Sequence, residues 1–413
     1  MSLLTPDATS DLGGPGWFVE RRATARSSFD ALGMPDAREE VWRYSPIGDL
    51  NLAAYSRSLP SGVPMAPLLE GLDSLECTRI TVSGGVPRAL PATPAGVSIS
   101  SVSSHGEGEG ILGSVAQDDE AIVAFNTANL PDALVIDVSR GAMVATPILV
   151  IHEIGEGATF SRTIIRMAEG SSATVIEVSC GGNDGALNVP VAEIAVGDGA
   201  NLRYGSIQVL DRSAWHLATI QATVGRDANI AQFTAGIGAA YDRCRTDAVL
   251  AGQGASSILR STYLGEGDQV HDLRTKQDHA APKTISDLLC KGAVTGSSRS
   301  VYTGLIKMQN GAVRSNATQT NHNLVLSKEA HADSVPNLDI AENDVRCSHA
   351  STVGPIDEDQ RYYLESRGIN PNEAERLLVR GFFADLLDKT ALPGATDFVA
   401  AVLNERFEGL EIS

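Results

Sequence analysis

The dominant pattern of the chain is a succession of short β-branched runs separated by glycine-containing turns, from about Cys77 to Val353. Apolar and polar residues alternate within many of these runs, and helical periodicity is nearly absent across this stretch. Such alternation is typical of strands, because successive side chains of a strand point to opposite faces of a sheet. The stretch therefore predicts a mainly β region. The clearest runs are Thr163–Ile165, Ala173–Val178, Ala192–Val196 and Ala218–Val224.

The turns between these runs recur at an even spacing of about 27 or 28 residues, beginning at Gly170, Gly197, Gly225 and Gly252. A fixed period of this size indicates a solenoid, in which each coil must stack on the next to bury its apolar face. A β-sandwich is the alternative, but sandwich loops rarely keep so even a spacing. We therefore predict a β-helix. The segment 268–285 interrupts the period, and residues 276–282 are its most loop-like part.

Helical patterns flank the β region on both sides. Near the N-terminus, apolar residues at helical spacing predict a helix over 17–32, with Gly33 as its stop, and a second short element over 37–44. After Pro355, Asp357 is placed to cap a helix that ends before Gly368. We expect these helical segments to cover the two open ends of the solenoid, because a stack of coils leaves unpaired strand edges there.

The last two predicted helices have their own start signals and apolar content. Asn370-Pro371 places an N-cap and a first-turn proline at the head of one, and the final helix covers about 397–407. The first of the two is apolar around more of its girth than one buried face requires. Either it forms an ordinary two-helix cap or it offers a docking surface for another protein, formed by Leu377, Leu378, Phe382, Phe383 and Leu386.

These patterns together predict four regions. We expect a mobile tail over residues 1–16, an N-terminal helical region over 17–76, a β-helix core over 77–355 and a C-terminal helical domain over 356–413.

Composition and charge narrow the class of partner. The formal net charge of −19 argues against nucleic acid or an anionic membrane as the main partner. The first 16 residues have neither the basic nor the apolar region of a signal peptide, and no apolar run is long enough to span a bilayer. The five cysteines are scattered and odd in number, which fits a reducing cytoplasm better than a disulfide framework.

Common catalytic motifs give no enzyme assignment. The G-x-G-x-x-G match at Gly108–Gly113 is surrounded by acidic residues that would repel phosphate, so we interpret it as a turn. The sequence has no P-loop, and we expect no ATP site of its own. His271-Asp272 and Asp278-His279 bracket the predicted loop and could form a carboxylate–histidine metal site, but plain solvated surface is the favoured interpretation.

The most informative pair is Cys347 and His349. They are two residues apart in a run with strand alternation, so we expect both on one face. A thiol and an imidazole side by side can bind a soft metal such as iron, or form an activated nucleophile with its base. The alternative is a buried cysteine that packs as a small hydrophobe beside a hydrogen-bonded histidine. Two ligands from one chain cannot complete an iron–sulfur site, so further ligands would come from elsewhere.

The surrounding residues carry a family resemblance. The run from Arg346 to Gly354, RCSHASTVG, followed by IDEDQ from Ile356 and YLESRGI from Tyr363, resembles the SufB/SufD family of iron–sulfur cluster assembly scaffold proteins. The N-terminal phrases GMP at Gly33 and EVWRY at Glu40 resemble the same family. The Cys-Ser-His run is closer to SufD than to SufB.

The resemblance implies a right-handed parallel β-helix with helical ends, whose C-terminal helices dock the ABC-type ATPase SufC. It also implies pairing with a SufB-like subunit, or with a second copy, and a transient iron–sulfur cluster at that interface. By the match of the Cys-Ser-His run, His349 would face the nascent cluster, and Cys347 matches less directly. The resemblance does not decide whether the complex binds a flavin.

One departure from the family pattern separates the two branches. SufB proteins carry an essential cysteine directly after a Thr-Gln pair, whereas Thr318-Gln319 is followed here by Thr320. The chain thus lacks the expected sulfur acceptor, which favours a non-catalytic SufD-like subunit over a SufB-like scaffold. Two other classes remain as alternatives. A carbohydrate-active enzyme on a β-solenoid would need a row of carboxylates along a groove, which we do not find, and a purely structural solenoid would give His349 no role.

Overall fold

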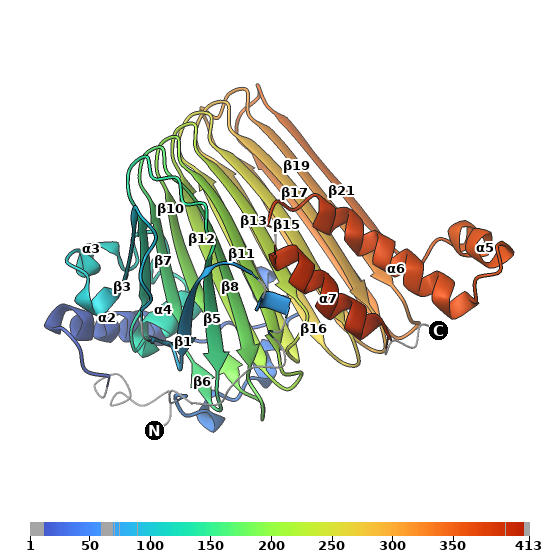
Figure 1. Ribbon diagram of the computed structural model, residues 1–413, viewed down its shortest axis with the longest axis horizontal. Helices are drawn as coiled ribbons and strands as arrows, with labels where there is room; N and C mark the ends of the chain where they lie inside the picture. The colour runs from blue at the N-terminus through green and yellow to red at the C-terminus, as the bar shows by residue number, and fades with distance from the viewer. Residues whose placement is uncertain are drawn as a thin grey trace.

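A computed structural model describes residues 12–58, 69, 71–73, 75–88, 90–392 and 394–408. Two long sheets of mostly parallel strands face each other and form a β-solenoid, in which each coil contributes one strand to each sheet (Figure 1). The predicted β-helix is therefore confirmed. Residues 1–11 of the predicted mobile tail lie outside the described residues.

Sheet 1 has ten strands and runs the length of the molecule. In spatial order they are β2 (Val86–Pro87), β1 (Thr78–Ser83), β5 (Ile148–Ile154), β8 (Ser172–Gly181), β11 (Asn201–Leu210), β13 (Asn229–Gly236), β15 (Ser256–Gly265), β17 (Ile285–Val294), β19 (Asn316–Val325) and β21 (Arg346–Gly354).

Sheet 2 has eleven strands. Its main path is β20 (His331–Ile340), β18 (Arg299–Met308), β16 (Val270–His279), β14 (Tyr241–Leu250), β12 (Trp215–Val224), β10 (Val191–Val196), β7 (Arg162–Met167), β4 (Leu134–Val138) and β3 (Val97–Ser101), with the short strands β6 (Ala158–Thr159) and β9 (Leu187–Asn188) beside it. Only the β1–β2 and β3–β4 pairs are antiparallel among the pairings that the structure describes.

The repeated glycines mark places where successive coils approach closely. A Cβ atom added to Gly252 would lie 2.0 Å from the backbone nitrogen of Arg226 in the preceding coil. Gly170 instead has a φ of 68°, a left-handed conformation that glycine adopts without strain. The period seen in the sequence thus reflects the stacking of the turns.

The space between the sheets changes character along the stack. In the first coils it is filled by interlocking aliphatic side chains such as Val150, Ile165 and Val175. Towards the last coil, buried amides such as Gln319 and Asn321 take their place. The interior is therefore apolar at the N-terminal end and increasingly polar at the C-terminal end.

The N-terminal segment packs on the outer face of sheet 2. Phe29 and Trp42 lie in one apolar cluster with residues of β9, β12 and β14, among them Leu217 and Tyr241. The segment's elements are α2 (Gly16–Leu32), the 3-10 turns η1 (Glu40–Trp42), η2 (Ile47–Asp49), η3 (Leu52–Ala54) and η5 (Val102–Ser104), and the helices α3 (Gly108–Ile111) and α4 (Ala121–Asn129).

The C-terminal helices lie against the outer face of sheet 1 (Figure 1). They are α5 (Glu358–Ser366), α6 (Pro371–Asp388) and α7 (Ala395–Glu408). The predicted caps are present, since the Asp357 side chain accepts from the Asp359 and Gln360 amides and the Asn370 side chain accepts from the Asn372 amide. Within the described residues, no helix is both long and apolar enough to cross a membrane.

Two predictions in the first third of the chain were wrong, namely the element over 37–44 and the absence of helix after Cys77. The prediction of a turn at Gly108–Gly113 was nearly correct. The element expected over 37–44 is only the single 3-10 turn η1. The nine-residue helix α4 lies within the stretch that showed almost no helical pattern. It was not predicted because eight of its residues are buried, so the helix has no polar face that would give a helical period in the sequence. The Gly108–Gly113 motif forms one short helical turn, α3, with no phosphate-binding context.

The predicted loop over 268–285 was also wrong. Residues 270–279 form the continuous strand β16, paired with β14 and β18. Its charged residues were mistaken for a solvated loop, but they pair across the sheet surface, as Arg274 does with Asp272 at 2.6 Å. His271 and His279 point to the interior and are fully buried.

The expectation that helices cover both ends of the stack failed at the C-terminal end. α6 lies on the flank of sheet 1, against β15 and β17, instead of over the last coil, and α7 packs in the same apolar cluster. β20 and β21 are consequently the terminal strands of their sheets, and most of their residues from Pro336 onward are half-buried or exposed. The apolar outer face of sheet 1 provides a larger surface for the helices than a strand edge does.

Candidate functional site

Cys347 and His349 lie on β21, the last strand of sheet 1. The parallel register pairs Cys347 with Ala317 and His349 with Gln319 on β19. Ala317 and Gln319 are buried and point to the interior of the solenoid. The prediction that Cys347 and His349 share one face is therefore confirmed, and the face is the interior one at the open end of the coil stack.

The two side chains differ in exposure. His349 is exposed, whereas Cys347 is half-buried and packs against the apolar cluster of Ile306, Met308 and Ala317. Burial raises the pKa of the Cys347 thiol, so the sulfur is protonated at neutral pH. Because a metal binds the thiolate, coordination by Cys347 would release a proton.

The layer directly below this pair is polar. Both side-chain atoms of the Gln319 amide are buried without a hydrogen-bond partner. Beside it, Asn321 Nδ2 donates to Ser334 Oγ at 2.8 Å, and Ser351 Oγ donates to the same oxygen at 2.7 Å. This network joins β19, β20 and β21, so the open end offers hydrogen-bonding groups.

Exposed apolar side chains surround this polar layer. Leu338 and Ile340 of β20 are 38% and 45% exposed, and Val353 of β21 is 44% exposed. By register they stand beside the interior residues Ile306, Met308 and Asn323, so they face the space between the two sheets, and β20 and β21 are the last strands that could cover it. The open end therefore combines unpaired strand edges with uncovered apolar side chains, a combination suited to pairing with another chain.

The donor set at this end is incomplete for a metal. Cys347 and His349 supply one sulfur and one nitrogen, ligands that suit iron. Across the described part of the chain, no group of three or more His, Cys, Asp or Glu residues is arranged to hold a metal ion. An iron–sulfur cluster at the open end would need ligands from a second chain.

The predicted docking residues of α6 divide into two sets. Phe383 and Leu386 are buried in the apolar cluster that joins α6 and α7 to sheet 1. Leu377 is 38% exposed, and Leu378 and Phe382 are half-buried. Of the five predicted residues, only the second set has exposed surface.

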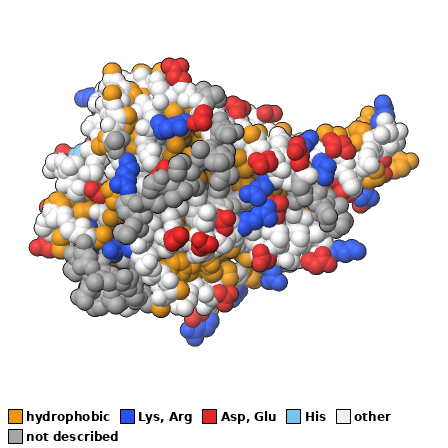
Figure 2. Space-filling view, turned by 60° about the horizontal axis from the view of Figure 1, so that its bottom comes forward, with side chains coloured by type: hydrophobic (Ala, Val, Ile, Leu, Met, Phe, Trp, Pro, Cys, Tyr) orange, Lys and Arg blue, Asp and Glu red, His pale blue; other side chains and the backbone are white. Residues whose placement is uncertain are grey.

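The helix α5 extends this exposed surface. It projects from the body beyond the end of α6, and apolar side chains gather at that projecting end (Figures 1 and 2). Tyr362 and Tyr363 are 73% and 56% exposed. The Arg361 guanidinium pairs with Glu375 of α6 at 3.0 Å, which holds α5 on α6.

An ion pair anchors α6 to the solenoid. Lys291 of β17 donates to Asp385 Oδ2 at 2.5 Å and to the Phe382 carbonyl at 3.1 Å. Hydrogen bonds from Lys291 and Lys389 lower the pKa of Asp385 to about 2. α6 is therefore tied to a strand two positions from β21 in sheet 1.

The histidines of β16 do not form the metal site considered from the sequence. His271 Nδ1 lies 3.2 Å from Asp242 Oδ2, and His279 contacts the hydroxyls of Thr284 and Ser286. Both histidines are interior residues, so the interpretation as solvated surface was also wrong.

A second interior polar cluster was not predicted from the sequence. His152 Nε2 lies 2.5 Å from Glu177 Oε2, and Tyr204 and Thr163 donate to the same carboxylate. Burial alone would raise the pKa of Glu177, but His152 and the two hydroxyls more than compensate and lower it. Polar residues at alternate positions of otherwise apolar strands were the available signal for this cluster.

The family model and the relatives that match this sequence all belong to one iron–sulfur cluster assembly family. The sequence matches the family model described as SUF system FeS cluster assembly, SufBD core domain, over residues 150–382, a range that includes Cys347 and His349. An iron–sulfur cluster assembly SufBD family protein of Mycobacterium tuberculosis is 31% identical over 392 residues, 92% of this chain and 91% of the relative.

Two proteins named SufD are also similar. The iron–sulfur cluster assembly protein SufD of Escherichia coli is 29% identical over 394 residues, 91% of this chain and 90% of the relative. The protein of the same name from Bacillus subtilis is 29% identical over 299 residues, 71% of this chain and 68% of the relative.

Proposed function

The chain belongs to the SufBD family of the SUF iron–sulfur cluster assembly system, and on this basis we propose that it is a SufD-like, non-catalytic scaffold subunit of a cytoplasmic assembly complex. The observation that carries the proposal is the open end of the solenoid, where His349 is exposed beside two unpaired strand edges. In this account the cluster is cargo that forms at the interface and is passed on.

The partner at the open end is a SufB-like subunit. Its strands would pair with the free edges of β20 and β21 and cover Leu338, Ile340 and Val353. The partner must also bring the sulfur acceptor, because Thr320 occupies the position where SufB proteins have their cysteine. This division of labour fits the described residues, in which no group of three or more metal donors is found.

His349 is the first ligand in this proposal and Cys347 the second. The imidazole of His349 is exposed and can bind iron while neutral. Cys347 is half-buried with a raised pKa, so it would join only when a metal displaces its proton. We therefore expect His349 to matter more for cluster formation than Cys347.

The second partner is an ATPase subunit of the SUF system, docked on α5 and α6. The exposed apolar residues Tyr362, Tyr363 and Leu377 form the surface for it. The Lys291–Asp385 pair connects this surface to β17, so movement of the helices can be transmitted towards the open end. The chain itself has no P-loop, which leaves nucleotide hydrolysis to the partner.

A second copy of the chain is the alternative partner at the open end. The free edges of β20 and β21 would accept it by the same backbone pairing. Coexpression of the tagged chain with SufB-like and SufC-like subunits, followed by anaerobic iron and sulfide loading of wild-type and His349→Ala complexes, separates the two cases. A homodimer that excludes the SufB-like subunit, or loading that is independent of His349, would contradict the proposal.

A further inference from the structure

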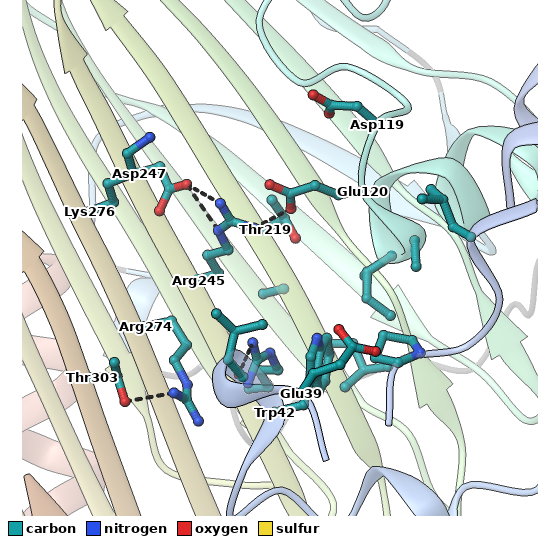
Figure 3. Close-up of a pocket in the computed structure, with 18 of the residues that line it drawn as sticks. Glu39, Trp42, Asp119, Glu120, Thr219, Arg245, Asp247, Arg274, Lys276 and Thr303 are labelled. Atoms are coloured by element: carbon teal, nitrogen blue, oxygen red, sulfur yellow. Dashed lines mark hydrogen bonds and ion pairs between the residues drawn. The ribbon is translucent and has the colours of Figure 1, made fainter. Parts of the chain in front are cut away.

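A cavity of about 470 Å³ lies on the outer face of sheet 2 (Figure 3). One wall is the N-terminal segment around Trp42, and the other is formed by outward side chains of β12, β14, β16 and β18. A cavity of this size is in the range of pockets that hold small organic molecules. None of its lining residues is among those named for the two proposed interfaces.

The floor of the cavity carries an excess of positive charge. Arg243 and Arg274 are both buried, and both pair with the single carboxylate of Asp272. Tyr241 donates to the same carboxylate at 2.9 Å, so three donors share the two oxygens of Asp272. Two guanidinium groups therefore share one negative charge.

Arg274 has a donor that the protein does not satisfy. Its Nε binds Asp272 and its Nη1 donates to Thr303 Oγ1 at 2.6 Å, but Nη2 is buried with no acceptor among the described residues. A buried charged donor without an acceptor is destabilising, because the hydrogen bonds that it made to water in the unfolded chain are not replaced. An acceptor supplied by a ligand would remove this destabilisation.

The other cations of the cavity are already neutralised. Arg245 lies between Asp247 and Glu120, as Figure 3 shows, and Lys276 pairs with Asp278 at 3.2 Å. Burial alone would lower the pKa of Arg245, but the two carboxylates outweigh it and raise the pKa. The unmatched positive charge is thus at Arg243 and Arg274.

The remaining lining is apolar and partly open. Arg243 stacks over the Trp42 ring with 3.6 Å between the guanidinium carbon and the ring centroid, which fixes the indole as a flat wall. Leu32 and Val41 at the rim are 51% and 55% exposed. Leu217 and Leu305 form the apolar part of the opposite wall.

We propose that this cavity binds a small organic monoanion with a flat apolar body, with its carboxylate or sulfonate group on Arg274 and its body against Trp42 and Leu305. The acidic lining residues Glu39, Asp119 and Glu120 exclude a polyphosphate, which would place further negative charges beside them. This inference is independent of the scaffold function.

The test uses anilinonaphthalene sulfonate, a fluorescent aromatic monoanion, titrated into the full-length protein. We expect saturable binding of one probe per chain, displacement by naphthoate, and no displacement by the uncharged naphthalene methanol. Arg274→Gln should weaken binding about tenfold or more, because a charge-assisted hydrogen bond is lost. Arg203→Gln, which changes an exposed arginine of β11 in sheet 1, is the matched control and should bind like wild type.

A second variant keeps the proposal testable if Arg274→Gln fails to fold. Leu305→Trp fills the apolar part of the cavity and leaves every ion pair in place, so it should also abolish saturable binding while the far-ultraviolet circular dichroism is unchanged. Unaltered probe affinity in both variants, or equal displacement by the charged and uncharged competitors, would overturn the proposal. Absence of saturable binding to the wild-type protein would overturn it as well.

Discussion

Gln319 of β19 and His349 of β21 are direct neighbours in the register of sheet 1, and the first is buried while the second is exposed. One coil earlier, Leu288 of β17 is in register with Gln319, so Leu288, Gln319 and His349 form one column of side chains along the interior face of sheet 1. The stack therefore changes from a closed interior to an open surface within a single strand spacing. A coil from another chain placed on this end would continue the column and face His349.

Charge on the open end should prevent pairing with the partner. We expect Ile340→Asp combined with Val353→Asp to weaken association with the SufB-like subunit by at least tenfold, because two carboxylates would be buried at the interface. Both side chains are about half exposed in the single chain, so its own stability should change by only about 0.5 kcal/mol per site. Analytical ultracentrifugation of the mixed subunits measures the association.

The matched control for this prediction is Met143→Asp. Met143 is 75% exposed in the connection between β4 and β5, far along the stack from the terminal coil. It should leave association unchanged. If Met143→Asp weakens the complex as much as the double variant does, then the pairing surface is not the open end.

The exposed and buried residues of α6 should separate docking from folding. Leu377→Asp should abolish capture of the ATPase subunit and leave the unfolding free energy within about 0.5 kcal/mol of wild type, since Leu377 faces solvent. Pull-down with the ATPase subunit and urea denaturation measure the two effects on the same samples.

Phe383→Ala is the companion variant. Phe383 is 2% exposed and stacks on Phe407 of α7 with 5.6 Å between ring centroids, so its truncation should cost about 3–5 kcal/mol of stability. If Leu377→Asp captures the ATPase normally and has normal stability, then α6 is not the docking element.

The stability of the solenoid should fall in mild acid because of His279. Burial lowers the pKa of this imidazole to about 4, whereas an unfolded chain protonates near 6.5. Above about pH 6.5 both states are neutral and nothing is lost. As the pH falls from about 6.5 to about 4 the unfolded state takes up the proton first, so stability decreases, by at most about 3 kcal/mol.

Urea denaturation at several pH values in this window checks the effect. His279→Gln cannot titrate, so its stability should depend less steeply on pH than that of the wild type. Other groups, including the buried His216, whose pKa is also lowered by burial, contribute equally to both proteins. Identical pH profiles for the two proteins would show that His279 does not set this dependence.

The sequence pattern predicted the repeat, the helix caps and the spacing of the site pair for local reasons. Turn glycines such as Gly252 are required where coils approach, and Asp357 and Asn370 cap helices through contacts with their immediate neighbours. The two-residue spacing of Cys347 and His349 determines their common face in any strand. Each of these features depends on residues that are close in sequence.

Features that depend on distant residues could not be predicted. β16 looked like a loop because several partners of its polar residues lie on β14, as Asp242 does for His271 and Arg243 does for Asp272. The position of α6 depends on an apolar outer face of sheet 1 assembled from many coils. The cavity at Arg274 requires the N-terminal segment to fold over sheet 2, which brings Trp42 beside Arg243, about two hundred residues away in the chain.

The most direct test of the scaffold account is cluster formation by the purified complex with the SufB-like and SufC-like subunits. Wild-type and His349→Ala complexes are loaded anaerobically with iron and sulfide, and the cluster is followed by its visible absorbance. His331→Ala is the control, because His331 is an exposed histidine of the terminal strand β20 that pairs with Asp333. We predict that all three complexes assemble and that only His349→Ala loses cluster formation. Full loading of the His349→Ala complex, or equal loss in His331→Ala, would contradict the assignment of the site to His349.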